Sequence, residues 1–175
     1  MAALERTPSN QNFLSPLGFK FMIHKTPSTN FFVQQCNVPA VATGDLLQPT
    51  PFIAVPVPGD HLTYGTLSVT FRVDEDMTNY LELYNWVTGV GFPESYEQYR
   101  DELNVNADIK TPTNMYSDGT LIIMNSNMNP NKEIIFKDLY PVNLGDVQFD
   151  VTQTDVEYVT CTCDFRFRSF DITSL

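Results

Sequence analysis

The sequence predicts a mainly β protein, with a β-sandwich or barrel-like core of antiparallel strands and one flanking amphipathic α-helix. Apolar and polar residues alternate over residues 147–152 and 158–168, so each run presents one apolar and one polar face, as a strand does. The polar connection 153–157 is short enough to join these two runs in a hairpin. Residues 76–88 instead carry apolar side chains three and four positions apart, which is the period of a helix.

Two further hairpins are predicted from the same alternation. Residues 19–23 and 32–36 flank a turn over 25–30, which predicts a first hairpin. Residues 120–124 and 133–137 flank an asparagine-rich turn and predict another. Each of these strands is expected to bury one face.

The segment from Pro39 to Pro58 is apolar and contains five prolines. Proline removes a backbone donor, so this segment is predicted to be an extended arm or an edge hairpin rather than a central strand. Its apolar side chains pack either over the protein's own core or on another subunit, and the sequence leaves both readings open.

A strand over 67–73 leads into the predicted helix at 76–88. The acidic residues Asp74, Glu75 and Asp76 suit a helix start, because carboxylates accept hydrogen bonds from its free N–H groups and favour the positive end of its dipole. Apolar spacing gives the face expected to pack on a sheet: Met77, Tyr80, Leu81, Tyr84 and Val87, with Leu83 and Trp86 beside it.

A second, short helix is expected over 93–103, and residues 137–150 are expected to form a polar turn before the last strands. Residues 1–15 are polar and contain turn-forming residues, so they predict a flexible N-terminal arm. The length of 175 residues suits a single domain spanning 1–175.

The composition argues against several functional classes. Ten Lys and Arg against 21 Asp and Glu give a net charge of −11, which disfavours a surface that binds phosphate backbones or anionic lipid. The simplest alternative reason for the acidity is that it keeps an aromatic-rich β protein soluble. No apolar leader or run of about 20 apolar residues is present, so we expect no membrane segment.

The sequence contains few residues in patterns suited to catalysis or metal binding. Cys36, Cys161 and Cys163 are expected to be small apolar core residues in a reducing compartment, because no Cys or His pair has the spacing of a zinc site. His24 lies in no catalytic motif, and His61 beside Asp60 is expected to sit in a turn. We therefore expect no catalytic residues, no cofactor, no metal and no enzyme activity.

Four short stretches stand out within the order of these elements. Three are Phe32-Val33-Gln34-Gln35-Cys36 followed by Val38-Pro39, Pro58-Gly59-Asp60, and Asp74-Glu75-Asp76 before Asn85-Trp86. The fourth and most specific is Leu139-Tyr140-Pro141-Val142-Asn143-Leu144-Gly145-Asp146-Val147. Over about residues 13–168 the chain resembles the tail tube proteins of contractile-tailed bacteriophages, which are related to the tube proteins of type VI secretion. The fourth stretch is similar to that family's aromatic-Pro-x-Asn-x-Gly-acidic turn.

This resemblance implies a structural virion protein that assembles itself into stacked hexameric rings, the inner tail tube through which DNA is ejected. The implied partners are the chain itself and the sheath, tape-measure and baseplate proteins, with assembly in the host cytoplasm and viral DNA passing without specific binding. Alternatives are a tube initiator, baseplate or terminator protein of the same fold, a glycan-binding β-sandwich, and a β-sandwich hydrolase.

The polar faces of the long strands are then expected to line the lumen. The proposed lumen-facing residues are Ser68, Thr70, Arg72, Gln148, Asp150, Thr160, Thr162 and Asp164. Hydroxyl and carboxylate groups without aromatic platforms give DNA little to bind, and like charge repels its backbone. The hypothesis is that acidity at the lumen serves DNA passage.

Overall fold

The computed structural model describes residues 11–91, 97, 115–150, 152 and 158–175. The predicted helix at 93–103 and the connection 153–157 fall outside the described residues, apart from the single position 97. Residues 1–10 of the predicted arm also fall outside them, while residues 11–14 are exposed and have no regular secondary structure.

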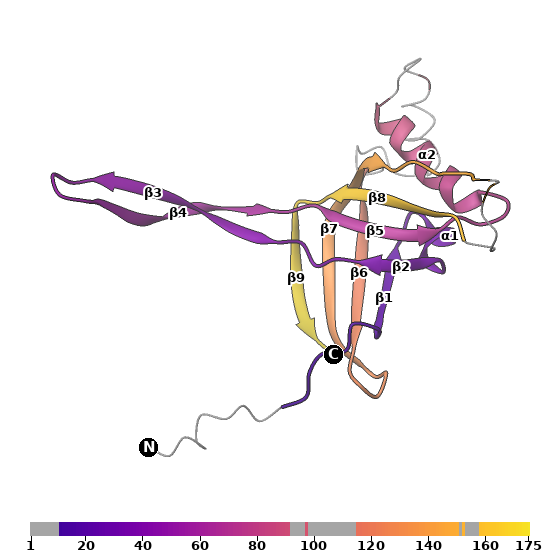
Figure 1. Ribbon diagram of the computed structural model, residues 1–175, viewed down its shortest axis with the longest axis horizontal. Helices are drawn as coiled ribbons and strands as arrows, with labels where there is room; N and C mark the ends of the chain where they lie inside the picture. Colours follow the sequence, from indigo (N-terminus) through magenta and orange to yellow (C-terminus); the bar gives the residue numbers. More distant parts are fainter. Residues whose placement is uncertain (1–10, 92–96, 98–114, 151, 153–157) are drawn as a thin grey trace.

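The described chain is mainly antiparallel β structure with two helices, which confirms the predicted fold class (Figure 1). The strands are β1 (Phe19–Ile23), β2 (Val33–Cys36), β3 (Val41–Pro49), β4 (Ala54–Tyr64), β5 (Leu67–Arg72), β6 (Ser117–Met124), β7 (Pro130–Leu144), β8 (Thr160–Arg166) and β9 (Ser169–Ser174). The helices are α1 (Pro27–Asn30) and α2 (Thr78–Gly91). The turn expected at 25–30 thus contains α1, and β9 was not predicted.

Strand β7 belongs to two sheets. Its first part pairs with β6 and β9, and β6 pairs with β1; we call these strands the β6 sheet. Its last part, from Tyr140 to Leu144, pairs with β8, and the order continues through β5 to β2; we call these strands the β8 sheet. In Figure 1 the strands of the β6 sheet run across the direction of β5 and β8. A single strand therefore fixes how the two sheets are placed.

The core lies where the alternating apolar side chains of the strands meet. The β8 sheet contributes Leu67, Val69, Phe71, Cys161, Cys163 and Phe165, and the β6 sheet contributes Phe21, Leu121, Ile134 and Phe136, all of them buried. The rings of Phe21 and Phe136 meet edge to face at 6.4 Å between centroids. The predicted burial of Cys161 and Cys163 is confirmed, and Cys36 packs against the core from β2.

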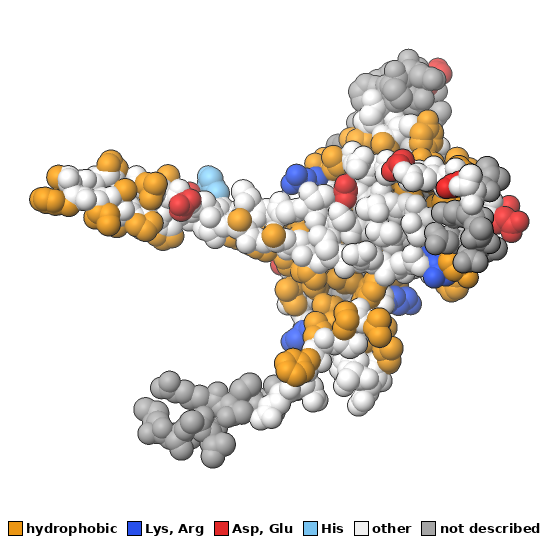
Figure 2. All heavy atoms as spheres, in the orientation of Figure 1, with side chains coloured by type: hydrophobic (Ala, Val, Ile, Leu, Met, Phe, Trp, Pro, Cys, Tyr) orange, Lys and Arg blue, Asp and Glu red, His pale blue; other side chains and the backbone are white. Residues whose placement is uncertain are grey.

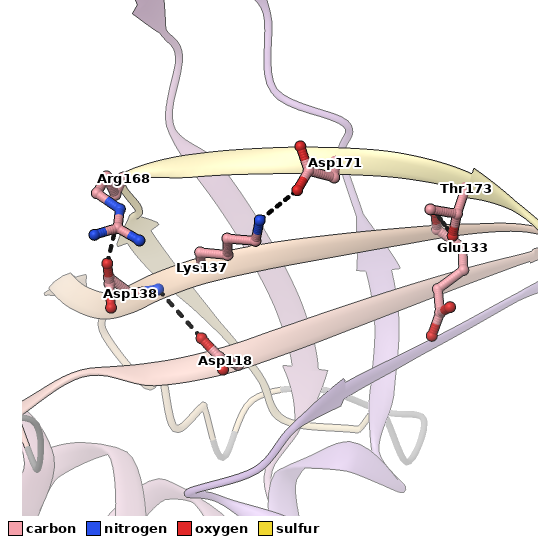
Figure 3. A network of polar contacts seen from close by, with 7 residues as sticks. All are labelled: Asp118, Glu133, Lys137, Asp138, Arg168, Asp171 and Thr173. Carbon is pink, nitrogen blue, oxygen red and sulfur yellow. Dashed lines mark hydrogen bonds and ion pairs between the residues drawn. The ribbon is translucent and has the colours of Figure 1, made fainter.

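The bend in β7 occurs at Asp138, whose φ of 54° is in the left-handed region. Polar contacts hold the backbone there (Figure 3). The Asp138 N–H donates to the Asp118 carboxylate at 3.3 Å, and Arg168 pairs with the Asp138 carboxylate at 3.0 Å. One residue before the bend, Lys137 pairs with Asp171 on β9. These contacts tie the bend to both neighbours of β7.

Strands β3 and β4 form a two-stranded sheet of their own, which projects from the body of the molecule (Figure 1). Of the two forms predicted for Pro39 to Pro58, an extended arm or an edge hairpin, the structure shows a hairpin, which extends to Tyr64. At its base the Gly65 N–H donates to the Ala40 carbonyl at 2.8 Å. His61 lies within β4, so the expected turn around it is wrong.

The first predicted hairpin is wrong in its pairing. The expected strands exist, but β1 pairs with β6 and β2 pairs with β5. Helix α1 carries the chain between the two sheets, and the Asn30 side chain closes this connection by accepting from the Ile23 N–H at 2.7 Å and donating to its carbonyl at 3.1 Å. Pairing with distant strands prevails here over pairing between sequence neighbours.

The predicted C-terminal hairpin is wrong as well. Residues 137–144 continue β7 instead of forming a turn, and residues 145–150 have no strand structure. Strand β8 pairs with β7 and β5. The polar residues Lys137 and Asp138 mark a bend within a strand, which in sequence resembles the end of one.

Helix α2 is confirmed, but its buried face differs from the predicted one. It buries Asn79, Leu83 and Trp86, while Leu81 and Tyr84 are about half exposed. The reason lies in Asn79, whose amide donates to the Arg72 carbonyl at 2.7 Å and accepts from the Asp74 N–H at 3.2 Å. Burying this asparagine turns the stripe of Leu83 and Trp86 inward, and Trp86 then packs on Phe165 at 6.1 Å.

Replacing Asp138 tests whether its backbone conformation holds the bend. A β-branched residue is strained in the left-handed region, so we expect Asp138→Val to lower the free energy of unfolding by about 2 kcal/mol. Asn tolerates this conformation, so Asp138→Asn should cost at most about 0.5 kcal/mol through the weakened surface pair with Arg168. Urea denaturation measures both values. Equal losses in the two variants would show that the pairing with Arg168, rather than the backbone, matters.

Candidate functional site

The polar face of the β8 sheet is the candidate functional site. Strands β5 and β8 pair so that Ser68 lies opposite Asp164, Thr70 opposite Thr162, and Arg72 opposite Thr160. Cross-strand partners share a face, so these six predicted residues lie together on one side of the sheet. The opposite side is the buried core face. The sheet therefore has one dry face and one polar face, as the alternation predicts.

Hydrogen bonds link the polar side chains across three strands. Ser68 on β5 donates to the Asp164 carboxylate on β8, and Asn143 on β7 donates to the other oxygen of Asp164 at 3.2 Å. The hydroxyls of Thr70 and Thr162 are 2.9 Å apart. These contacts satisfy the carboxylate and order the surface, so Asp164 acts here as an acceptor that ties three strands together.

Two arginines lie on this face as well. The Arg72 guanidinium stacks over the Tyr158 ring, 4.2 Å from its centroid. The same guanidinium donates to the side-chain amide oxygen of Gln34 when that oxygen is turned toward it. Arg166 continues the face beyond Asp164 and donates to the Tyr64 carbonyl at 3.4 Å. Both side chains are exposed. The strands of the polar face thus carry positive charge as well as negative charge.

The remaining two predicted residues, Gln148 and Asp150, do not lie on a strand. Beyond Gly145 the chain leaves β8, and Gln148 donates to Asp146 at 3.0 Å. Asp150 accepts from the Thr152 hydroxyl at 2.6 Å and from its N–H at 2.8 Å, and these hydrogen bonds lower the pKa of the Asp150 carboxyl. The expectation that both residues alternate along a strand is wrong, because the strand ends at Leu144.

Gln35, Asn143 and Arg166 also lie on this face and were not predicted to do so. Extending the alternation of β8 by two positions would have found Arg166. Gln35 lies opposite Thr70, and Asn143 lies opposite Asp164. Their positions follow from pairings between strands distant in sequence, which the alternation of a single strand does not reveal.

Both edges of the β8 sheet lack a strand partner within the described part of the chain. Strand β2 pairs with β5 alone, and the segment Tyr140–Leu144 of β7 pairs with β8 alone. Unpaired edges present backbone N–H and C=O groups to any strand that approaches them. On the β2 edge, Cys36 is half-buried, and burial raises the pKa of its thiol to about 12. A thiol of this kind is a packing residue rather than a nucleophile.

The described residues offer few groups suited to catalysis or ligand binding. They contain no group of three or more His, Cys, Asp or Glu side chains able to hold a metal ion. An open hollow of about 480 Å³ at one end of the β8 sheet is lined by Phe31, Phe32, Arg72 and Tyr158 among others. Trp86 is buried in the core, as its helical position predicts, and so is not available to stack on a sugar. No described helix has the length and apolarity needed to cross a bilayer.

Comparison with known proteins relates this chain to phage tail tube proteins. No protein-family model matches the sequence. The tail tube protein of Serratia phage KSP90 is 26% identical over 133 residues, which cover 75% of this chain and 67% of that protein. The chain is a relative of phage tail tube proteins. The resemblance inferred from the sequence is thereby confirmed.

Solved structures show the same fold with little sequence identity. A chain in the sheath–tube complex of the extracellular contractile injection system PVC has a TM-score of 0.57 at 10% identity, with 94% of each chain covered. The tube-terminating cap of the anti-feeding prophage has a TM-score of 0.59 at 12% identity, with both chains fully covered. Tail tube proteins are structural proteins, so the chain is not an enzyme.

Gly145, in the stretch that resembles the tail-tube turn, has a physical role in this fold. The Gly145 N–H donates to the Thr162 carbonyl at 2.7 Å, which brings the two backbones into contact at the end of β7. A Cβ at this position would lie 2.8 Å from that carbonyl oxygen. Glycine is therefore required where β7 leaves β8, next to the polar face.

Substituting this glycine tests the close approach. We expect Gly145→Ala to lower the free energy of unfolding by about 1–3 kcal/mol, because the methyl group meets backbone that has no room to move. Gly91→Ala is the control, since a Cβ there meets nothing within 4 Å. Chemical denaturation with hydrogen exchange at β7 and β8 measures the effect. A Gly145→Ala variant as stable as Gly91→Ala would contradict the account.

Proposed function

We propose that the chain is the main subunit of the inner tail tube of a contractile-tailed phage, forming hexameric rings that stack into a conduit for DNA ejection. The observation that supports this proposal is the β8 sheet: one face is buried, the other is polar, and neither edge pairs with another strand that the structure describes. A sheet of this kind becomes complete when copies join edge to edge into a barrel with a wet interior.

The strand directions are compatible with such a closure. In the order β7–β8–β5–β2 every neighbouring pair is antiparallel. Strand β2 therefore runs opposite to β7. Rotation about a ring axis preserves these directions, so β2 of one subunit meets the end of β7 of the next in antiparallel orientation. Each junction satisfies two edges that the monomer leaves open, and all subunits remain equivalent.

The polar face would then line the lumen. On the strands, the proposed lumen residues remain Ser68, Thr70, Arg72, Thr160, Thr162 and Asp164, and Gln35, Asn143 and Arg166 are added by their position on the same face. Gln148 and Asp150 remain proposed lumen residues from the loop that follows β7. The partners would be further copies of the chain and the sheath, tape-measure and baseplate proteins. The protein would be assembled in the host cytoplasm as one domain over 1–175 with a flexible arm at 1–15, and would reside in the virion.

The curated relative favours the main tube subunit over a tube initiator or terminator, because it is named a tail tube protein.

Electron microscopy of the purified protein in negative stain over a concentration series tests the proposal. We expect six-fold rings or hollow tubes to appear as concentration rises. A particle of small, fixed size at every concentration would contradict it.

A charge comparison tests the role of the lumen in DNA passage. On the strands and the adjoining loop, the carboxylates of Asp146, Asp150 and Asp164 outnumber the guanidinium groups of Arg72 and Arg166 by one. Like charge should keep DNA off the wall. We expect Asp150→Asn with Asp164→Asn to slow genome ejection several-fold, and Arg72→Gln with Arg166→Gln to leave it unchanged or faster, with tubes forming in both variants. Ejection kinetics of the two mutant phages measure this. Equal rates would refute electrostatic clearance.

A further inference from the structure

The proposed lumen gives no role to the apolar side chains exposed on the β3–β4 hairpin. We propose that the distal half of this hairpin, residues 46–57, is buried on both of its faces between two other copies of the chain. This inference rests on the proposed self-assembly and adds to it the number of copies that each hairpin contacts.

The strand register places apolar side chains on both faces of the hairpin. Leu46 lies opposite Val57 on one face, and Leu47 lies opposite Pro56 on the other. Leu46 is 64% exposed and Leu47 is 63% exposed. A hairpin that packs by one face alternates apolar and polar side chains, as the β8 sheet does. Here neither face is polar, so one contact surface would leave the other apolar face in water.

The hairpin also lacks support from its own chain. No other described strand pairs with β3 or β4, and an isolated two-stranded sheet is only marginally stable in water. At the tip, Thr50 accepts from the Ile53 N–H at 3.1 Å, while Phe52 and Ile53 are exposed. Figure 2 shows hydrophobic side chains gathered over the distal end of this arm. Contact with other molecules would stabilise the extended shape.

The charge pattern favours a copy of the same chain as the partner. Residues 46–59 contain no ionisable side chain, although the whole chain has a net charge of −11. Two strongly acidic subunits repel each other, and an uncharged segment is where they approach at the least electrostatic cost. A lipid partner is disfavoured, because the outer backbone groups of both strands would be unpaired in hydrocarbon.

A matched pair of substitutions tests the two faces separately. Leu46→Lys and Leu47→Lys introduce the same charge at neighbouring positions with nearly equal exposure and opposite orientation. Both side chains are exposed in the monomer, so neither variant should change its unfolding temperature. We expect each substitution to raise the protein concentration needed for polymerisation by roughly 30-fold or more, because each charge would be placed in a buried contact.

Sedimentation across a concentration series measures the assembly threshold, with wild-type protein in parallel. The control is Leu175→Lys, whose leucine is 63% exposed and lies outside the hairpin. We expect this control to assemble as the wild type does, and a raised threshold for it would overturn the proposal by showing that any added charge blocks assembly.

The outcomes separate this inference from the proposed function. If the wild type assembles while only one of Leu46→Lys and Leu47→Lys is impaired, the hairpin docks by a single face and the inference is wrong. If both variants assemble normally, the hairpin is not a contact between copies. If the wild type itself does not assemble, the proposed function fails first.

Discussion

The membership of β7 in two sheets is the constraint on which the rest of the structure depends. Asp138, with its left-handed backbone, lies between the part of β7 that pairs with β9 and the segment Tyr140–Leu144 that pairs with β8. The contacts of Asp138 with Asp118 and Arg168 hold the bend from both sides. Placing the last part of β7 against β8 then gives the β8 sheet its outer edge and brings Asn143 to Asp164. Packing, the polar face and the proposed ring closure all follow from this placement.

The two faces of the β8 sheet explain how one strand pair serves both folding and function. Phe71 and Phe165 point into the core and carry the hydrophobic stabilisation, while Thr70 and Thr162 point away and carry none of it. Substitutions on the polar face can therefore change the proposed lumen surface without removing core contacts. The β3–β4 hairpin meets both only at its base, where Tyr64 packs against the core and accepts from Arg166.

The sequence predicts well what depends on short-range pattern. The alternation in β5 and β8 identified both strands and six residues of the polar face, and the prolines from Pro39 to Pro58 identified the projecting hairpin. It predicts poorly what depends on distant partners. Two strands adjacent in sequence, β1 and β2, pair with β6 and β5, and the polar pair at Lys137 and Asp138 resembles a turn although β7 continues. The buried face of α2 was missed because a polar residue, Asn79, fixes it.

The most direct test of the account is a helical reconstruction of purified tubes by cryo-electron microscopy at a resolution that shows side chains. The account predicts that Thr70 and Thr162 face the central channel and that β2 of each subunit pairs through its main chain with Tyr140–Leu144 of the next. Tubes in which this polar face is buried between rings or turned to the outer surface would contradict it.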